Sequence, residues 1–131
     1  MKKVLLIGDS IRLLYQPKVT KLLEGVYEVC GPADNGRFVK YSINELERWI
    51  AGFGKPDIIH WNNGLWDSAV VCEEDGAFTP VDEYTRYLKI MLRELRKYTE
   101  KIIFATTTPV REGSANQKLS YIIERNMARC V

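Results

Sequence analysis

Short apolar runs alternate along the chain with longer segments of helical periodicity. The runs that predict buried strands lie at residues 1–8, 26–30, 58–62 and 101–106. Between and after them, apolar residues recur at spacings of three and four, which predicts a helix after each strand. Repeated strand–helix alternation predicts an α/β fold, with a mostly parallel sheet covered by helices on both faces.

Capping residues predict where the helices begin and end. The first helical pattern covers 11–24, and Pro17 predicts that its regular part begins there. Residues 42–45 (Ser-Ile-Asn-Glu) match a capping box, which predicts the start of the second helix. Residues 79–82 and 114–117 carry N-terminal signals for the remaining two helices.

Composition limits the class of protein. The 131 residues are 46% hydrophobic and 27% charged, which is typical of one globular domain. A net charge of +2, without a basic block, argues against a nucleic-acid partner, and no apolar run is long enough for a membrane helix. Cys30, Cys72 and Cys130 have neither CxxC nor metal-ligand spacing, so we expect reduced thiols, a cytoplasmic location and no metal or organic cofactor.

Candidate chemistry lies where the first strand ends, at Gly8-Asp9-Ser10. Gly8 permits a sharp turn, and Ser10 then stands at the start of the helical segment. Backbone N–H groups at a helix start are unpaired and can stabilise an oxyanion beside an exposed serine hydroxyl. The alternative interpretation is a plain turn with Asp9 or Ser10 as N-cap.

The other polar, glycine-rich loops follow the remaining strands. They lie around 35–36, 63–67 and 107–109. Because parallel strands end at the same edge of a sheet, we expect these loops to gather around Ser10, where ligands bind in open α/β sheets.

Three short blocks, in order on successive strands, resemble the SGNH or GDSL-type serine hydrolases, and most closely the members that deacetylate carbohydrates. Gly8-Asp9-Ser10 matches their first block, Asn35-Gly36-Arg37 resembles the second, and Gly64-Leu65-Trp66-Asp67 falls at the third. The resemblance covers nearly the whole chain. It implies a three-layer α/β/α, flavodoxin-like fold with a parallel sheet of order 2-1-3-4.

The resemblance also implies roles for individual residues. Ser10 would be the nucleophile, and the backbone N–H groups of Ser10 and Gly36 would hold the oxyanion. The third-block Asn of the family is Trp66 here, so Trp66 or Asn63 would complete the set of donors. Trp66 is equally well interpreted as a pocket wall or sugar-stacking platform, and Asn62 and Asn63 as turn residues or donors. Asp9 would lie in the same pocket, and Asp67 would tie the loops together.

The fifth block of the family, Asp-x-x-His after a fifth strand, is not found in this chain. We therefore expect one domain over 1–131 that lacks this C-terminal part. The single histidine, His60, lies within a predicted strand, and we interpret it as structural. Ser10 then has no visible base, which predicts weak or absent ester cleavage.

Two functions remain open on these grounds. The first is an SGNH-type carboxylic ester hydrolase, an acetylesterase or acylhydrolase acting on a small-molecule or carbohydrate ester. The second is a non-catalytic module of the same fold that binds a carbohydrate or acyl ligand. In either case we expect self-association, as a homodimer, through the exposed fourth strand or the last helix. Ile122, Ile123 and Met127 of that helix are predicted to face inward, and without a fifth strand they would lose part of their cover and leave an apolar patch.

Overall fold

The computed structural model describes residues 1–128, which contain a four-stranded parallel sheet. Its strands are β1 (Lys2–Ile7), β2 (Tyr27–Cys30), β3 (Ile58–Trp61) and β4 (Ile102–Phe104). The order is β2-β1-β3-β4, with every neighbouring pair parallel. The predicted α/β class and strand order are therefore confirmed.

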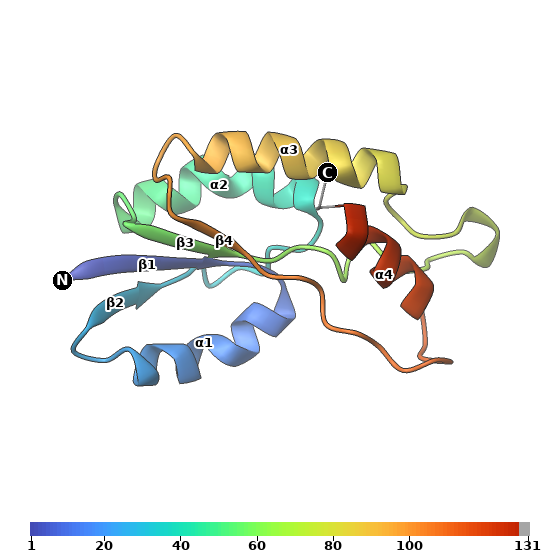
Figure 1. Cartoon of the computed structure of the whole chain (residues 1–131), viewed down its shortest axis with the longest axis horizontal. Helices are drawn as coiled ribbons and strands as arrows, with labels where there is room; N and C mark the ends of the chain where they lie inside the picture. The colour runs from blue at the N-terminus through green and yellow to red at the C-terminus, as the bar shows by residue number, and fades with distance from the viewer. Residues whose placement is uncertain (129–131) are drawn as a thin grey trace.

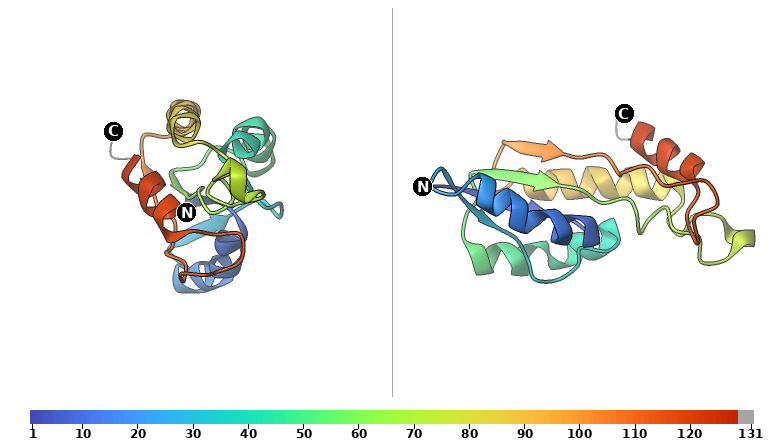
Figure 2. Two further views of the ribbon diagram at one scale, coloured as in Figure 1. Left: turned by 90° about the vertical axis from the view of Figure 1, so that its right-hand side faces the viewer. Right: turned by 90° about the horizontal axis from the view of Figure 1, so that it is seen from below.

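Helices lie on both faces of this sheet. Helix α1 (Ser10–Leu22) covers one face, while α2 (Val39–Phe53) and α3 (Val81–Leu95) lie side by side on the other (Figure 1). Figure 2 shows the sheet between these two layers. Helix α4 (Leu119–Ala128) lies beyond the carboxyl ends of the strands and contacts α3. A short 3-10 turn, η1 (Glu73–Asp75), lies in the loop between β3 and α3.

The hydrophobic core fills the space between the sheet and the pair α2 and α3. It includes Leu5, Ile59 and Trp61 from the strands, and Leu46 and Met91 from the helices. Residues 4–7 of β1 are apolar and buried throughout, as in a strand covered on both faces. This core fixes the carboxyl edge of the sheet as a rigid base for the loops.

Helix α1 begins seven residues earlier than Pro17 predicts, because Pro17 lies inside the helix and not at its start. Asp9 caps the helix: its Oδ1 accepts a hydrogen bond of 3.0 Å from the Ile11 N–H. Pro17 is exposed on the solvent side of the helix. The local cap at Asp9 therefore sets the start of the helix, and the exposed Pro17 is tolerated inside it.

Helix α2 begins at Val39, three residues before the predicted capping box at Ser42. The Ser42 hydroxyl does not cap the helix; it donates to the Gly36 carbonyl at 2.7 Å. The N–H of Val39 is satisfied instead by the side chain of Asp67, from another loop, at 3.1 Å. A cap supplied from 28 residues away carries no local sequence signal.

The last helix also differs from its prediction. Ile122 is buried, but Ile123 and Met127 are 48% and 67% exposed, so their predicted inward placement is wrong. Arg125 is buried instead, and its guanidinium donates to the Thr79 carbonyl at 2.5 Å. This polar attachment turns the other face of α4 outward.

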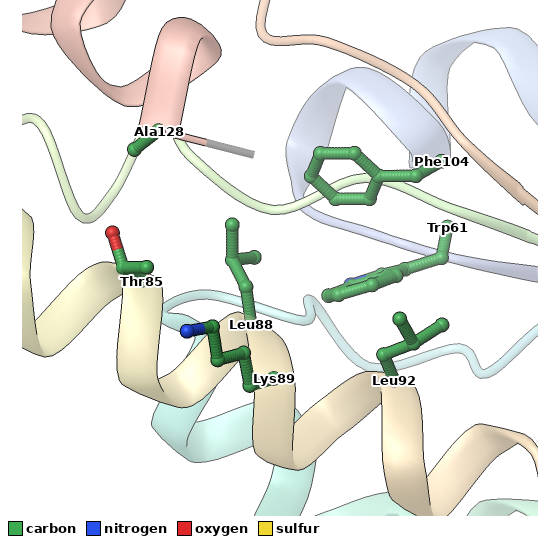
Figure 3. Close-up of a pocket in the computed structure, with 7 residues that line it drawn as sticks. All are labelled: Trp61, Thr85, Leu88, Lys89, Leu92, Phe104 and Ala128. Atoms are coloured by element: carbon green, nitrogen blue, oxygen red, sulfur yellow. The ribbon is translucent and has the colours of Figure 1, made fainter. Parts of the chain in front are cut away.

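An apolar cavity of about 150 Å³ lies between β3, β4 and α3. The rings of Trp61 and Phe104 contact each other at 4.4 Å between centroids and form one wall (Figure 3). Leu88 and Leu92 lie opposite, and the amine of Lys89 points away from the two rings. The cavity therefore offers apolar packing surface and few polar groups that could bind a ligand.

Within residues 1–128, no helix is both long and apolar enough to span a membrane. In the same part of the chain, Cys30 and Cys72 have free thiols, and no three His, Cys, Asp or Glu side chains cluster as metal ligands. Cys130 lies outside the described residues.

Replacing Pro17 by Ala tests the start of α1. Because Pro17 lies mid-helix, it removes one backbone hydrogen bond, and Pro17→Ala should raise the free energy of unfolding by about 1–3 kcal/mol. Urea denaturation measures the change. Lys18→Ala, at the next exposed position, is the control and should change stability by less than about 0.5 kcal/mol. Unchanged stability in Pro17→Ala would place the helix start at residue 17, where a proline removes no helical hydrogen bond.

Candidate functional site

Three loops meet closely at the carboxyl edge of the sheet. The N–H of Gly36, from the loop after β2, donates to the carbonyl of Gly8 at 2.8 Å. The N–H of Asn62, just after β3, donates to the Ile7 carbonyl at 3.0 Å. A side chain at Gly8 would lie 2.0 Å from Asn62 Oδ1, so only glycine allows this approach. The turn that carries Ser10 is thus held from both sides.

Ser10 is the first residue of α1 and is exposed. Within residues 1–128 its hydroxyl has no hydrogen-bonding partner among the side chains. Asp9, directly before it, is buried, and burial raises the pKa of its carboxyl group although the Ile11 N–H opposes this. The Oδ2 atom of Asp9 is buried without a partner in the described structure. The predicted nucleophile is therefore presented to solvent on a rigid, capped helix start.

The two asparagines after β3 point to opposite faces of the sheet. The Asn63 side chain is buried and fully used: it accepts from the Trp61 indole N–H at 2.6 Å and donates to the Arg37 carbonyl and the Ser42 hydroxyl. Because both amide N–H bonds are engaged, Asn63 is not free to bind an oxyanion in this conformation.

Asn62 faces the α1 side, next to the Ser10 turn. Its Oδ1 accepts from the Tyr15 hydroxyl at 3.2 Å, and its Nδ2 lies 3.5 Å from Asp9 Oδ1. One amide N–H therefore remains available beside the turn. Of the two asparagines considered from the sequence, Asn62 has the better placement for a donor.

Gly36 has the predicted location but not a free donor. Its N–H is engaged by the Gly8 carbonyl, so the role expected from the resemblance is not available to it in this conformation. A Cβ atom at Gly36 would lie 2.5 Å from that same carbonyl oxygen, so glycine is needed here for close packing.

Asp67 is a buried hydrogen-bond acceptor shared by two segments. Its Oδ1 accepts from the Thr79 hydroxyl at 2.7 Å, and its Oδ2 accepts from the Val39 N–H at 3.1 Å. Burial raises the pKa of Asp67 to about 6, although these hydrogen bonds and the charge of Arg125 lower it. Asp67 thus ties the start of α2 to the loop that leads into α3.

Trp66 packs edge-on against Phe38, with 5.2 Å between ring centroids. Phe38 in turn stacks on Phe78 at 4.4 Å. Trp66 is therefore a half-buried member of an aromatic cluster, and its role as oxyanion donor or pocket wall stays a prediction.

His60 lies on the α1 side of β3 and is half-buried. Its Nδ1 is 3.2 Å from the Tyr15 hydroxyl, and burial lowers the pKa of the ring. Burial also raises the pKa of Tyr15 to about 12, so the phenol stays protonated and can donate. His60 therefore contacts the Ser10 turn only indirectly, through Tyr15 and Asn62, and no contact makes it a base for Ser10.

Arg12 is a site residue that the sequence pattern does not reveal. It is 1% exposed, and its guanidinium donates to the carbonyls of Pro32 and Asp34 and to Gln16 Oε1 at 2.7–2.8 Å. Burial lowers the pKa of this group. It fastens α1 to the loop that carries Gly36. A lone arginine in a helical pattern normally predicts a solvated face, so nothing in the sequence indicates this role.

The fold is similar to that of several solved esterase structures. The acetyl xylan esterase AlAXEase superposes with a TM-score of 0.73 at 18% identity, over 98% of this chain and 70% of that chain. TesA gives a TM-score of 0.72 at 19% identity, over 97% and 70% of the two chains. A variant of Axe2, an acetyl xylan esterase from Geobacillus stearothermophilus, gives 0.72 at 15% identity, over 98% and 70%. No protein-family model and no curated protein matches the sequence. At these identities the likeness establishes the fold, which is that of the SGNH-type hydrolases.

Replacing Asp67 by Asn tests the buried carboxylate. The folded-state pKa of Asp67 is about 6, above its ordinary value of 3.8, so the folded protein binds the proton more tightly than the unfolded chain does. This contribution to stability is complete below pH 4 and is lost as the pH rises to 6, a loss of about 3 kcal/mol. Asp67→Asn should lack this loss, because an amide can accept from Val39 and donate to Thr79.

Urea denaturation between pH 4 and pH 7 compares the two proteins, with Asp75→Asn, at an exposed position, as the control. Parallel stability curves for Asp67→Asn and the parent would show that the pKa of Asp67 is not raised.

Proposed function

We propose that this chain is a serine-dependent carboxylic ester hydrolase of SGNH type, with Ser10 as its nucleophile. The observation that carries the proposal is the exposed Ser10 hydroxyl on the first turn of α1, beside Asn62, at the carboxyl edge of a sheet shared with solved esterases. The esterase neighbours favour a small-molecule ester as substrate, and the acetyl xylan esterases among them favour an acetyl ester of a carbohydrate.

In this proposal the Ser10 oxygen attacks the carbonyl carbon of the ester and gives its proton to water or to an added base. The bond from the carbonyl carbon to the alcohol oxygen breaks, the alcohol leaves with a proton, and water then hydrolyses the acyl group from Ser10. Negative charge develops on the carbonyl oxygen, which the backbone N–H of Ser10 and the side-chain amide of Asn62 stabilise. The charge also interacts favourably with the N-terminus of α1. Asp9 holds the turn by capping α1, and Gly36 holds it from the other side.

Activation of Ser10 is the weak step. The only histidine of the chain is held by Tyr15, and no other base contacts Ser10 within residues 1–128. In a template serine protease, removal of the base lowers turnover by roughly a millionfold, and the oxyanion donors retain only a small residual rate. We therefore propose weak intrinsic cleavage, which an added base should increase. The same observation supports the second candidate, a module that binds an ester or its sugar without cleaving it.

Labelling by a fluorophosphonate tests the nucleophile. The parent chain should be labelled slowly at Ser10, and free imidazole should speed the labelling because it supplies the missing base. Ser10→Ala should abolish labelling with and without imidazole, whereas Ser120→Ala, at another exposed serine, should label like the parent. Labelling of Ser10→Ala at the parental rate would refute the assignment. A parent that never labels would favour the binding module.

We also infer that the chain self-associates through β4. This strand forms one edge of the described sheet, and Ile103 at its centre is 55% exposed. Light scattering at micromolar concentration should give a mass above the 15.1 kDa of one chain. Ile103→Lys should restore the single-chain mass, while Leu14→Lys, at an exposed position on α1, should not. A single-chain mass for the parent contradicts the inference.

A further inference from the structure

A chain of polar contacts links β3 to the Ser10 turn through Tyr15 of α1. The Tyr15 hydroxyl oxygen lies 3.2 Å from His60 Nδ1 and 3.2 Å from Asn62 Oδ1. Beyond it, Asn62 Nδ2 lies 3.5 Å from Oδ1 of Asp9, the residue that caps α1. The chain of contacts therefore runs from the only histidine of the sequence to the residue directly before Ser10.

Backbone geometry brings these groups together. His60 and Asn62 are two residues apart, on β3 and directly after it, so their side chains leave the sheet on the same face, which α1 covers. The Tyr15 ring meets the His60 ring edge-on, with 5.8 Å between centroids and 86° between the planes. The Asn62 amide packs against Gly8, where a Cβ atom would lie 2.0 Å from Oδ1. These contacts place the three side chains before any ligand binds.

The direction of each hydrogen bond follows from the number of protons. A phenol has one proton to donate, and an amide oxygen can only accept. Burial raises the pKa of Tyr15 to about 12, so the phenol is protonated at neutral pH, and its contact with Asn62 Oδ1 uses that single proton. The Tyr15 oxygen can then only accept from His60. Because burial lowers the pKa of His60, the neutral ring carries its one proton on Nδ1 and none on Nε2.

The opposite direction is disfavoured where the chain of contacts ends, at Asp9. If Tyr15 donated to His60, the Asn62 amide would turn over to offer its N–H bonds to the phenol oxygen. Its Oδ1 would then face Asp9 Oδ1, and two acceptor oxygens repel one another. The Asp9 oxygen is held in place, because it also accepts from the Ile11 N–H at 3.0 Å. The cap of α1 therefore fixes the direction of every bond up to His60.

This direction decides what Asn62 presents to a ligand. Because Oδ1 accepts from Tyr15, Nδ2 lies on the side of the Ser10 turn, where Asp9 uses only one of its two N–H bonds. Asn62 also lines a groove of about 340 Å³ together with Ile11, the residue directly after Ser10. The second N–H therefore borders space that a ligand can enter beside Ser10.

We propose that Tyr15 is a positioning residue of the Ser10 site: its hydroxyl donates to Asn62 Oδ1 and so turns the Asn62 amide N–H toward the substrate. His60 donates from Nδ1 to the Tyr15 oxygen and thereby directs the phenol proton to Asn62. The inference rests on the proposed function, in which Asn62 is the side-chain donor to the oxyanion. It gives the only histidine of the chain a role that needs no contact with Ser10.

The tautomer of His60 tests the direction of the hydrogen bonds. Two-bond proton–nitrogen correlation spectra of the whole, untagged chain at about pH 8 contain a single histidine, so both ring nitrogens are assigned directly. The parent should carry a proton on Nδ1 and none on Nε2. Tyr15→Phe removes the acceptor, so its spectrum should move toward the Nε2–H form. Tyr27→Phe, at another half-buried tyrosine, is the control and should keep the parental spectrum.

Fluorophosphonate labelling of Ser10 tests the positioning role. Tyr15→Phe should slow labelling about threefold to tenfold, as the loss of one hydrogen bond does, and Tyr27→Phe should leave the rate within about twofold of the parent. In an Asn62→Ala background, Tyr15→Phe should cause no further slowing, because Tyr15 acts through Asn62. Circular dichroism confirms that each variant is folded, and if Asn62→Ala does not fold, the His60 tautomer in the parent and in Tyr15→Phe decides.

A parent with its proton on Nε2 overturns the proposal, as does a Tyr15→Phe variant that keeps the parental tautomer or labels as fast as an active parent. Equal slowing by Tyr15→Phe with and without Asn62 also overturns it. The spectra require no catalysis, so the two hypotheses fail separately. Labelling of Ser10 with the His60 proton on Nε2 overturns only this inference, whereas a proton on Nδ1 in a chain that never labels overturns only the nucleophile.

Discussion

The packing of two loops at the carboxyl edge of the sheet depends on one buried carboxylate. Asp67 accepts from Val39 and Thr79 and so fixes the start of α2 against the loop that leads into α3. Burying this group disfavours its charged form, which is why its pKa rises to about 6. Two donors and the nearby Arg125 offset only part of that penalty. An apolar residue at this position would avoid the desolvation penalty but could not accept these two hydrogen bonds. Asp67 satisfies a helix N–H and a loop hydroxyl that would otherwise be buried without partners.

Most of the sheet could be predicted from the sequence because its signals are local. An apolar run such as Val4 to Ile7 can be satisfied only in a covered strand, and strand–helix alternation then leaves few topologies. The start of α2 was harder to predict, since its capping partner comes from another part of the chain. Ser42 has the sequence of a cap, but its hydroxyl bonds to the Gly36 carbonyl, while the N–H that needs a cap finds Asp67. Pro17 was misleading for another reason. It lies on the exposed side of α1, where the helix tolerates the loss of one backbone hydrogen bond.

The position of Ser10 at the start of α1 followed from the sequence, but the choice between Asn62 and Asn63 as its neighbour did not. Alternation along β3 places His60 and Asn62 on the α1 side, and Trp61 and Asn63 on the opposite side. The alternation is visible in the sequence, but which side α1 covers is not, so the two asparagines could not be told apart. Arg12 was missed for a different reason. Its partners include the backbone carbonyls of Pro32 and Asp34. Every residue has a backbone carbonyl, so such an acceptor cannot be recognised from the sequence.

The arrangement around Ser10 separates two requirements of ester cleavage that usually occur together. Stabilising the oxyanion needs fixed dipoles, and under the proposed function the capped α1 terminus and the side-chain amide of Asn62 would supply them. Activating the hydroxyl needs a base whose pKa lies near the working pH. His60 has the right chemistry but lies on the strand, engaged by Tyr15, and burial lowers its pKa further from that role. Under that proposal the sheet edge would bind and polarise an ester while Ser10, without a base, stays a poor nucleophile. Binding and cleavage of the ester would then be physically separable properties of the proposed site.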